Sequence, residues 1–180
     1  MGDAKLLGAD DDSYSSTVNM NVRWTSHVAV ASGTLKSLRV KCATSGFVTL
    51  AIFSDNANSP GLLLASTPST GVAAGWNTIG VSDVEIISGI KYWLANHPSA
   101  AGIVYLMADS GQPLKYLLNP GYPIMWANNP SGLTSATYRI AIAGWGEVVG
   151  GGGAGRLIGA KSRLIGGPSP LIGGPSPLIG

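Results

Sequence analysis

Residues 34–53 read TLKSLRVKCATSGFVTLAIF, and this stretch decides the fold class. The run 34–42 places apolar side chains on one face and Arg39 and Lys41 on the other, and the run 47–53 alternates in the same way. The apolar positions of the two runs are Leu38, Val40, Cys42, Val48, Leu50 and Ile52. This period of two is typical of strands with one buried face. Because only a short turn, 44–46, separates the runs, we expect them to pair as a hairpin.

Outside this stretch the sequence contains further short runs bounded by Gly, Pro, Asn, Asp or Ser. They are residues 17–24, 27–31, 62–66, 76–81, 90–96, 103–108, 114–118, 122–126 and 137–145. Regular short strands of this kind predict an all-β protein, here an antiparallel β-sandwich. We expect four tryptophans to supply much of its buried area, namely Trp24, Trp76, Trp93 and Trp126.

The composition bounds the classes of partner. Apolar residues make up 45% of the 180 residues and charged residues only 11%, against a usual charged share of about 25%. So few charges favour self-association. A net charge of +2 gives no reason to expect a nucleic-acid partner, and no apolar run approaches the roughly 20 residues of a membrane span. Cys42 has no second cysteine to pair with, and its place in the alternation predicts a buried, inert thiol.

Composition also divides the chain. Residues 1–16, which contain Asp10, Asp11 and Asp12, are expected to form an N-terminal arm, and residues 17–149 the β-sandwich. At Gly150 a run of glycines begins, which predicts a flexible linker. Residues 150–180 then form a linker and a repeat tail.

Three motifs carry a resemblance to a known module. They are VTLAIFSDNANSPGLLLA at 48–65, AGWNT at 74–78 and GIKYWLA at 89–95. In this order they resemble a jelly-roll-type β-sandwich module of prokaryotic surface proteins and phage virion proteins, over residues 30 to 145. The resemblance implies a jelly-roll fold and no single activity. No signal peptide opens the sequence, which favours a virion component made in the host cytoplasm over an extracellular or cell-surface protein.

The tail repeats Leu-Ile-Gly every seven residues. The apolar pairs are Leu157 and Ile158, Leu164 and Ile165, Leu171 and Ile172, and Leu178 and Ile179. Prolines between the later pairs exclude a helix, so we expect an extended chain. Low-complexity tracts of this composition are usually disordered, but exposed Leu and Ile side chains are costly in water. Their regular spacing predicts a strip that docks on neighbouring subunits.

Candidate chemistry is sparse in this sequence. His27 and His97 lie in no catalytic signature, and no nucleophile motif or cofactor-binding fingerprint occurs, so we expect a protein that is not an enzyme and has no cofactor. Asp55, Asn56 and Asn58 carry oxygen ligands suited to Ca²⁺. The surrounding sequence is more typical of a tight turn between strands, and we predict no metal site.

Aromatic residues in the later strands suggest an alternative role. Tyr105, Tyr116, Tyr122 and Trp126 are candidates for a platform on which sugar rings stack. The leading expectation is a structural, self-assembling virion component, a capsid decoration, cement or fibre protein. Such a protein would be a homo-oligomer, with a trimer as one option, bound to capsid or other virion proteins. The alternatives are a carbohydrate-binding adhesin module and a subunit of a prokaryotic surface filament.

Overall fold

Strands are the only regular elements in the part of the chain that the computed structural model describes, residues 3–10, 16–108, 113–118 and 120–149. The strands are β1 (Asp3–Gly8), β2 (Ser16–Thr17), β3 (Val22–Val28), β4 (Gly33–Cys42), β5 (Gly46–Asn56), β6 (Ser59–Ser66), β7 (Thr70–Val72), β8 (Gly75–Ile86), β9 (Lys91–Pro98), β10 (Tyr105–Ala108), β11 (Leu114–Leu117), β12 (Thr134–Ala136), β13 (Tyr138–Ile140) and β14 (Ile142–Val148). The prediction of an all-β chain is confirmed.

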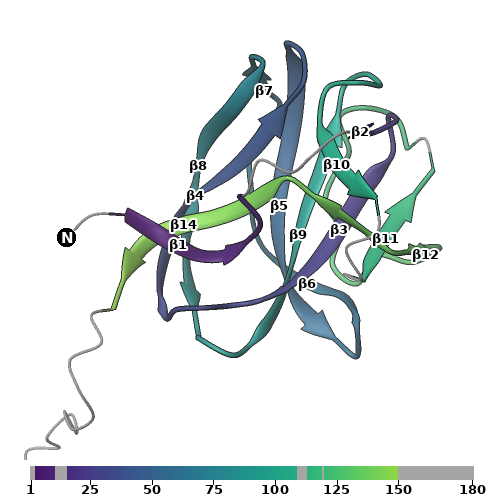
Figure 1. Ribbon diagram of the computed structural model, residues 1–180. Coiled ribbons are helices and arrows are strands. Elements are labelled where there is room, and N and C mark those ends of the chain that lie inside the picture. The colour runs from purple at the N-terminus through teal and green to yellow at the C-terminus, as the bar shows by residue number, and fades with distance from the viewer. Residues whose placement is uncertain (1–2, 11–15, 109–112, 119, 150–180) are drawn as a thin grey trace, which may run out of the picture. The chain divides into compact units, whose positions relative to one another are not determined.

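Two antiparallel layers pack together (Figure 1). One layer is a four-stranded sheet in the order β1-β14-β4-β8, and a short sheet, β13-β10-β2, adjoins it. Backbone bonds from Lys41 N to Ala141 O and from Ala141 N to Tyr105 O join these two sheets. The other layer has the order β12-β11-β3-β9-β5-β6, with β7 paired to β5. The predicted β-sandwich is therefore correct.

The deciding stretch forms both predicted strands, but they do not pair with each other. β4 pairs with β14 and β8, whereas β5 pairs with β6, β7 and β9 in the opposite layer. The predicted hairpin is therefore wrong. Both strands present their apolar faces to one core, with Leu38 and Leu50 at 0% exposure. Residues 43–45 cross between the layers, so that the apolar faces of β4 and β5 meet across the core.

The predicted N-terminal arm is also wrong. Residues 3–8 form β1, which pairs with β14 from Asp3 opposite Glu147 to Gly8 opposite Ala143. Leu6 and Leu7 are fully buried in the core. Burying each leucine stabilises the fold by roughly 1.5–3 kcal/mol, which is the physical reason why this short segment joins the sheet.

A second apolar cluster lies outside the main core. It combines Val22, Trp24, Ala51, Phe53, Trp93 and Ala95 of β3, β5 and β9. These side chains alternate with those of the main core, so they lie on the outer face of their sheet. The segment 118–133 covers them with Ile124, Trp126 and Leu133.

This cover segment corrects another prediction. Residues 122–126 were expected as a strand, but within the described part of 118–133 no strand forms. Trp24 and Trp93 are buried as predicted, whereas Trp76 and Trp126 are only half-buried. Cys42 is buried as predicted, and burial raises its pKa to about 12, since the charged thiolate is disfavoured away from water. The predicted linker and tail, 150–180, lie outside the described residues.

Candidate functional site

One end of the sandwich exposes a group of apolar side chains, which we call the end patch. Its members are Val28, Val30, Ile87, Ile90 and Val149, with exposed fractions of 49–69%. Backbone bonds bring their segments together: Ala29 N donates to Ile90 O, Gly89 N to Ala29 O, and Val149 N to Ser32 O. Single exposed apolar residues are ordinary, whereas several on neighbouring segments make this end a candidate binding surface.

A hollow of about 480 Å³ lies beside the end patch. Ile86, Ile87 and Val149 contribute apolar walls, and Asp83 and Glu85 contribute carboxylates. This hollow can hold an aliphatic side chain and present negative charge to what lies next to it.

Carboxylates gather near this hollow. Thr34 of β4 pairs with Glu85 of β8 on one side and with Glu147 of β14 on the other, and Asp3 of β1 pairs with Glu147. Directly paired residues share a face of the sheet. Lys36 bonds Asp83 at 2.6 Å and also feels the charges of Glu147 and Asp3. We call Asp3, Asp83, Glu85 and Glu147 the acidic rim.

A pocket of about 630 Å³ opens elsewhere, and we call it the Arg23 pocket. Its lining includes Ser16, Asn19, Arg23, Tyr116, Leu118 and Tyr138. Arg23 is only 8% exposed, and its Nη1 donates to Asn19 O at 2.9 Å and to Asn21 O at 3.4 Å. Burial lowers the pKa of its guanidinium to about 10, while Tyr116 acts in the opposite direction. Arg23 is therefore charged at neutral pH.

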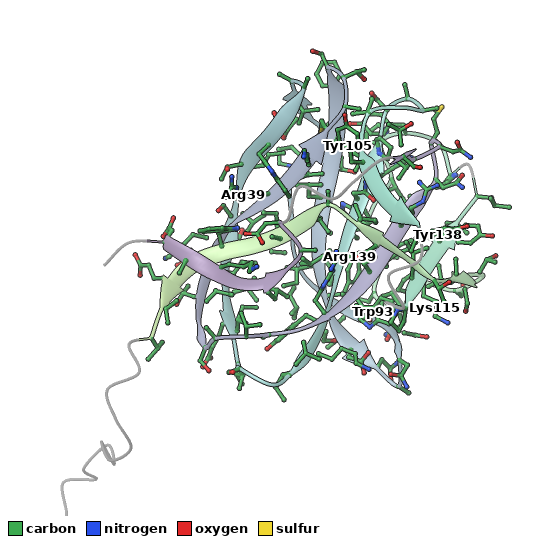
Figure 2. The ribbon with its side chains drawn as sticks, viewed as in Figure 1. Arg39, Trp93, Tyr105, Lys115, Tyr138 and Arg139 are labelled. Carbon is green, nitrogen blue, oxygen red and sulfur yellow. The ribbon has the colours of Figure 1, made fainter. Side chains whose placement is uncertain are left out.

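A row of cations and aromatic rings lies on the four-stranded sheet and its neighbour. The Arg39 guanidinium lies 5.4 Å from the Trp76 ring centre and 4.9 Å from that of Trp145. The Lys41 ammonium lies 5.6 Å from the ring of Tyr105. In the view of Figure 2, Arg39 and Tyr138 lie on opposite sides, and no residue of this row lines the Arg23 pocket. Sequence reasoning missed the row because Trp145 follows Arg39 by more than 100 residues.

The weak metal candidates lie at the turn between β5 and β6: Asp55 and Asn56 end β5, and Asn58 is in the turn. Ala57 and Asn58 join β5 to β6 with φ of 48° and 64°. Asp55 accepts bonds from Trp93 Nε1 at 2.7 Å and from Asn58 N at 3.4 Å, and Asn56 Nδ2 donates to Asn129 Oδ1. The three residues thus have structural partners, and the described residues contain no group of three His, Cys, Asp or Glu side chains placed to hold a metal.

The four aromatic candidates for sugar binding lie in different surroundings. Tyr116 lines the Arg23 pocket, and Tyr105 contacts Lys41. Tyr122 contacts the ring of His97, with ring centres 5.0 Å apart. Trp126 packs edge-on against Trp24 and Phe53, at 6.0 and 5.9 Å between ring centres. Of the four, Tyr116 lines the Arg23 pocket, where it is joined by Arg23 and Tyr138, which the sequence did not single out.

Both histidines are buried in strands, His27 at 8% exposure and His97 at 0%. Burial lowers the pKa of both imidazoles, that of His27 to about 4. His97 Nδ1 accepts a bond from Ile124 N at 3.3 Å. The neutral form of His97 therefore helps to hold the cover segment in place.

Comparison of the chain with known protein families, curated proteins and solved structures gives no match. No helix of the described residues is long and apolar enough to cross a membrane.

Proposed function

We propose that this protein is a structural, self-assembling component of a virion, a capsid decoration, cement or fibre protein. The end patch is the observation that carries the proposal, because it exposes five apolar side chains beside a hollow. In this proposal the patch is the receiving half of a contact between copies. The homo-oligomer then binds capsid or other virion proteins, and a trimer is one symmetry that fits.

The occupant that we propose is the repeat tail of a neighbouring copy. Its Leu-Ile pairs, such as Leu164 and Ile165, match the apolar walls of the hollow in chemistry. Its cations, Arg156, Lys161 and Arg163, come without any acid in residues 150–180, and they complement the acidic rim. Residues 156–180, if extended, reach up to about 80 Å at roughly 3.3 Å per residue, which is enough to span from one copy to the next.

The virion setting and the jelly-roll topology rest on the sequence motifs at 48–65, 74–78 and 89–95. A subunit of a prokaryotic surface filament, placed outside the cell, would use the same contact between copies. The two settings differ in what the assembled protein is attached to, so the genes beside this one distinguish them: capsid or tail genes support the virion.

Light scattering after size-exclusion chromatography tests the contact in the full chain. A patch variant, Val30→Ser with Ile87→Ser, and a tail variant, Leu164→Ser, Ile165→Ser, Leu171→Ser and Ile172→Ser, each lose association with themselves. Mixed together they form a complex, because one retains the tail and the other retains the patch. Met125→Ser, at a position 91% exposed, is the control and associates as the wild type does.

Two results would overturn this proposal. Either the wild type is monomeric at micromolar concentration, or the patch variant associates as strongly as the wild type. A tail that docks on its own chain leaves the wild type monomeric, which is the first of these two results.

A further inference from the structure

We propose that the Arg23 pocket binds a sugar that carries a carboxylate, with the Arg23 guanidinium as the group that receives the carboxylate. This activity is separate from the contact proposed for self-assembly, because no residue of the end patch lines the pocket. A protein that assembles on a virion or a cell surface would use such a pocket to attach to acidic glycans.

The pocket contains one buried positive charge that has no carboxylate partner among the described residues. Arg23 is the one charged residue in its lining among the described residues, and none of the described residues forms a salt bridge with it. A buried cation without a paired carboxylate is costly unless an anion reaches it. The pocket therefore selects a ligand with one negative charge.

The geometry of Arg23 favours a carboxylate. Within the described part of the chain its hydrogen bonds all come from Nη1, to the backbone oxygens of Asn19 and Asn21. A guanidinium has five N–H groups arranged in a planar fork. The two backbone bonds fix the position of the fork and leave Nε and Nη2 for a planar, two-oxygen acceptor such as a carboxylate.

The rest of the lining favours a sugar over a simple anion. Ser16 and Asn19 supply polar groups, Tyr116 and Tyr138 supply rings with hydroxyls, and Leu118 supplies an apolar wall. This mixture of apolar faces and a few polar groups suits a pyranose ring, which has hydroxyls at its edge and C–H groups on its faces. The volume of about 630 Å³ leaves room for more than one sugar unit.

A second polar side chain lies beside Arg23, although it does not line the pocket. Asn96 of β9 and Tyr116 of β11 are the residues that pair with Arg23 across β3, so the three side chains lie on one face of the sheet. Asn96 is fully buried, and neither Nδ2 nor Oδ1 of its amide has a partner in the described residues. Because Asn96 is closed off from solvent, its amide adds polarity next to Arg23 and is not itself offered to the ligand.

Isothermal titration of the full chain with glucuronic acid and with its methyl ester tests the proposal, because the ester keeps the ring and removes the charge. We expect the acid to bind at least tenfold more tightly than the ester. N-acetylneuraminic acid is titrated in parallel, and acetate and inorganic phosphate are added as competitors at the same ionic strength. An acidic sugar should still bind in their presence. Displacement of the sugar by equimolar acetate would mean that the pocket binds anions in general, and it would overturn the proposal that the ligand is a sugar.

Variants then assign the binding to this pocket. Arg23→Gln should weaken glucuronic acid at least tenfold, and Tyr138→Ala, at a side chain 42% exposed, should weaken it several-fold while keeping the fold. Leu62→Ser, at an exposed position outside the pocket, is the control and should bind as the wild type does. If Arg23→Gln does not fold, the comparison of acid with ester and the affinity of Tyr138→Ala still test whether the pocket binds the carboxylate of a sugar. Equal affinity for acid and ester, equal affinity in Tyr138→Ala, or no binding at 10 mM sugar overturns the proposal.

Discussion

Gly146 occupies the closest approach between β14 and β4. A Cβ at this position would meet the Thr34 carbonyl oxygen and lie 2.8 Å from Leu35 Cα. Both are backbone atoms, so an added methyl group must push the two strands apart. We expect Gly146→Ala to lower the free energy of unfolding by about 3 kcal/mol, measured by urea denaturation.

The matched control for this substitution is Gly80→Ala in β8. An added Cβ at Gly80 meets nothing within 4 Å, so the free energy of unfolding should change by less than about 0.5 kcal/mol. Equal urea concentrations at the midpoint of denaturation for Gly146→Ala and Gly80→Ala would contradict the close approach of β14 to β4.

His27 makes the stability of the protein depend on pH. Burial, followed by the charge of Arg139, lowers its pKa from 6.5 to about 4 in the folded state. In the unfolded chain His27 is therefore protonated below about pH 6.5, whereas in the folded chain it is protonated only below about pH 4. The free energy of unfolding should fall as the pH drops through this window, by up to about 3 kcal/mol from this residue.

Denaturation curves at pH 7, 5.5 and 4.5 check this dependence. The pKa of His97 is lowered as well, so His97 adds to the loss of stability of the wild type at low pH. His27→Gln cannot titrate, so its stability should fall less steeply than that of wild type. Parallel curves for the two proteins would mean that His27 is not responsible.

The cover segment, 118–133, is the element whose role the structure shows most directly. Asn128 Oδ1 accepts a bond from Leu63 N at 2.7 Å, and Asn129 N donates to Gly61 O at 2.7 Å. With the bond from Ile124 to His97, these contacts hold the segment over the outer apolar cluster. The segment covers the cluster together with Leu63 of β6 and Leu117 of β11.

Trp126→Ala tests this element against its neighbour Met125→Ala. Trp126 contacts Trp24 and Phe53, so its loss should cost about 2–3 kcal/mol, less than for a fully buried tryptophan. Exposure of Trp24 should also shift the fluorescence emission to longer wavelength. Met125 is 91% exposed, so Met125→Ala should change neither quantity. A stable Trp126→Ala variant with unshifted emission would contradict a packing role for this ring.

Elements also show how far sequence reasoning reaches. Alternation in β4 correctly predicted which face is buried, because a period of two follows directly from strand geometry. In β5 it predicted one buried face, but Thr49, Ala51 and Phe53 on the other face are buried as well. Alternation could not predict partners, since a buried face is equally satisfied by a hairpin or by an opposed sheet. Residues 122–126 are apolar enough for a strand, yet they cover a sheet without pairing in it. β1 was missed because two adjacent leucines show no period.

The same limit applies to the sites of the whole molecule. Tyr116 was singled out as an aromatic in a late strand, and it does line a pocket. Arg23 was not, because a charged residue in an alternating strand is normally exposed, and its burial depends on β9 and β11, far away in the sequence. The end patch likewise arises only when residues 28–30, 87–90 and 149 meet. Long-range contacts create these surfaces, so local patterns cannot reveal them.

Ionic strength separates the two contributions that we propose for assembly. The apolar contact between tail and end patch does not depend on simple salt, whereas the pairing of tail cations with the acidic rim is screened. Three exposed pairs at roughly 0.5 kcal/mol each correspond to about a tenfold rise in the dissociation constant of the full chain between 50 and 500 mM NaCl. Arg156→Gln with Lys161→Gln and Arg163→Gln should still associate, with a dissociation constant that hardly changes with salt. Analytical ultracentrifugation measures the dissociation constants of the wild type and of this triple variant. Equal salt dependence in the two proteins would show that the tail cations do not pair with the acidic rim.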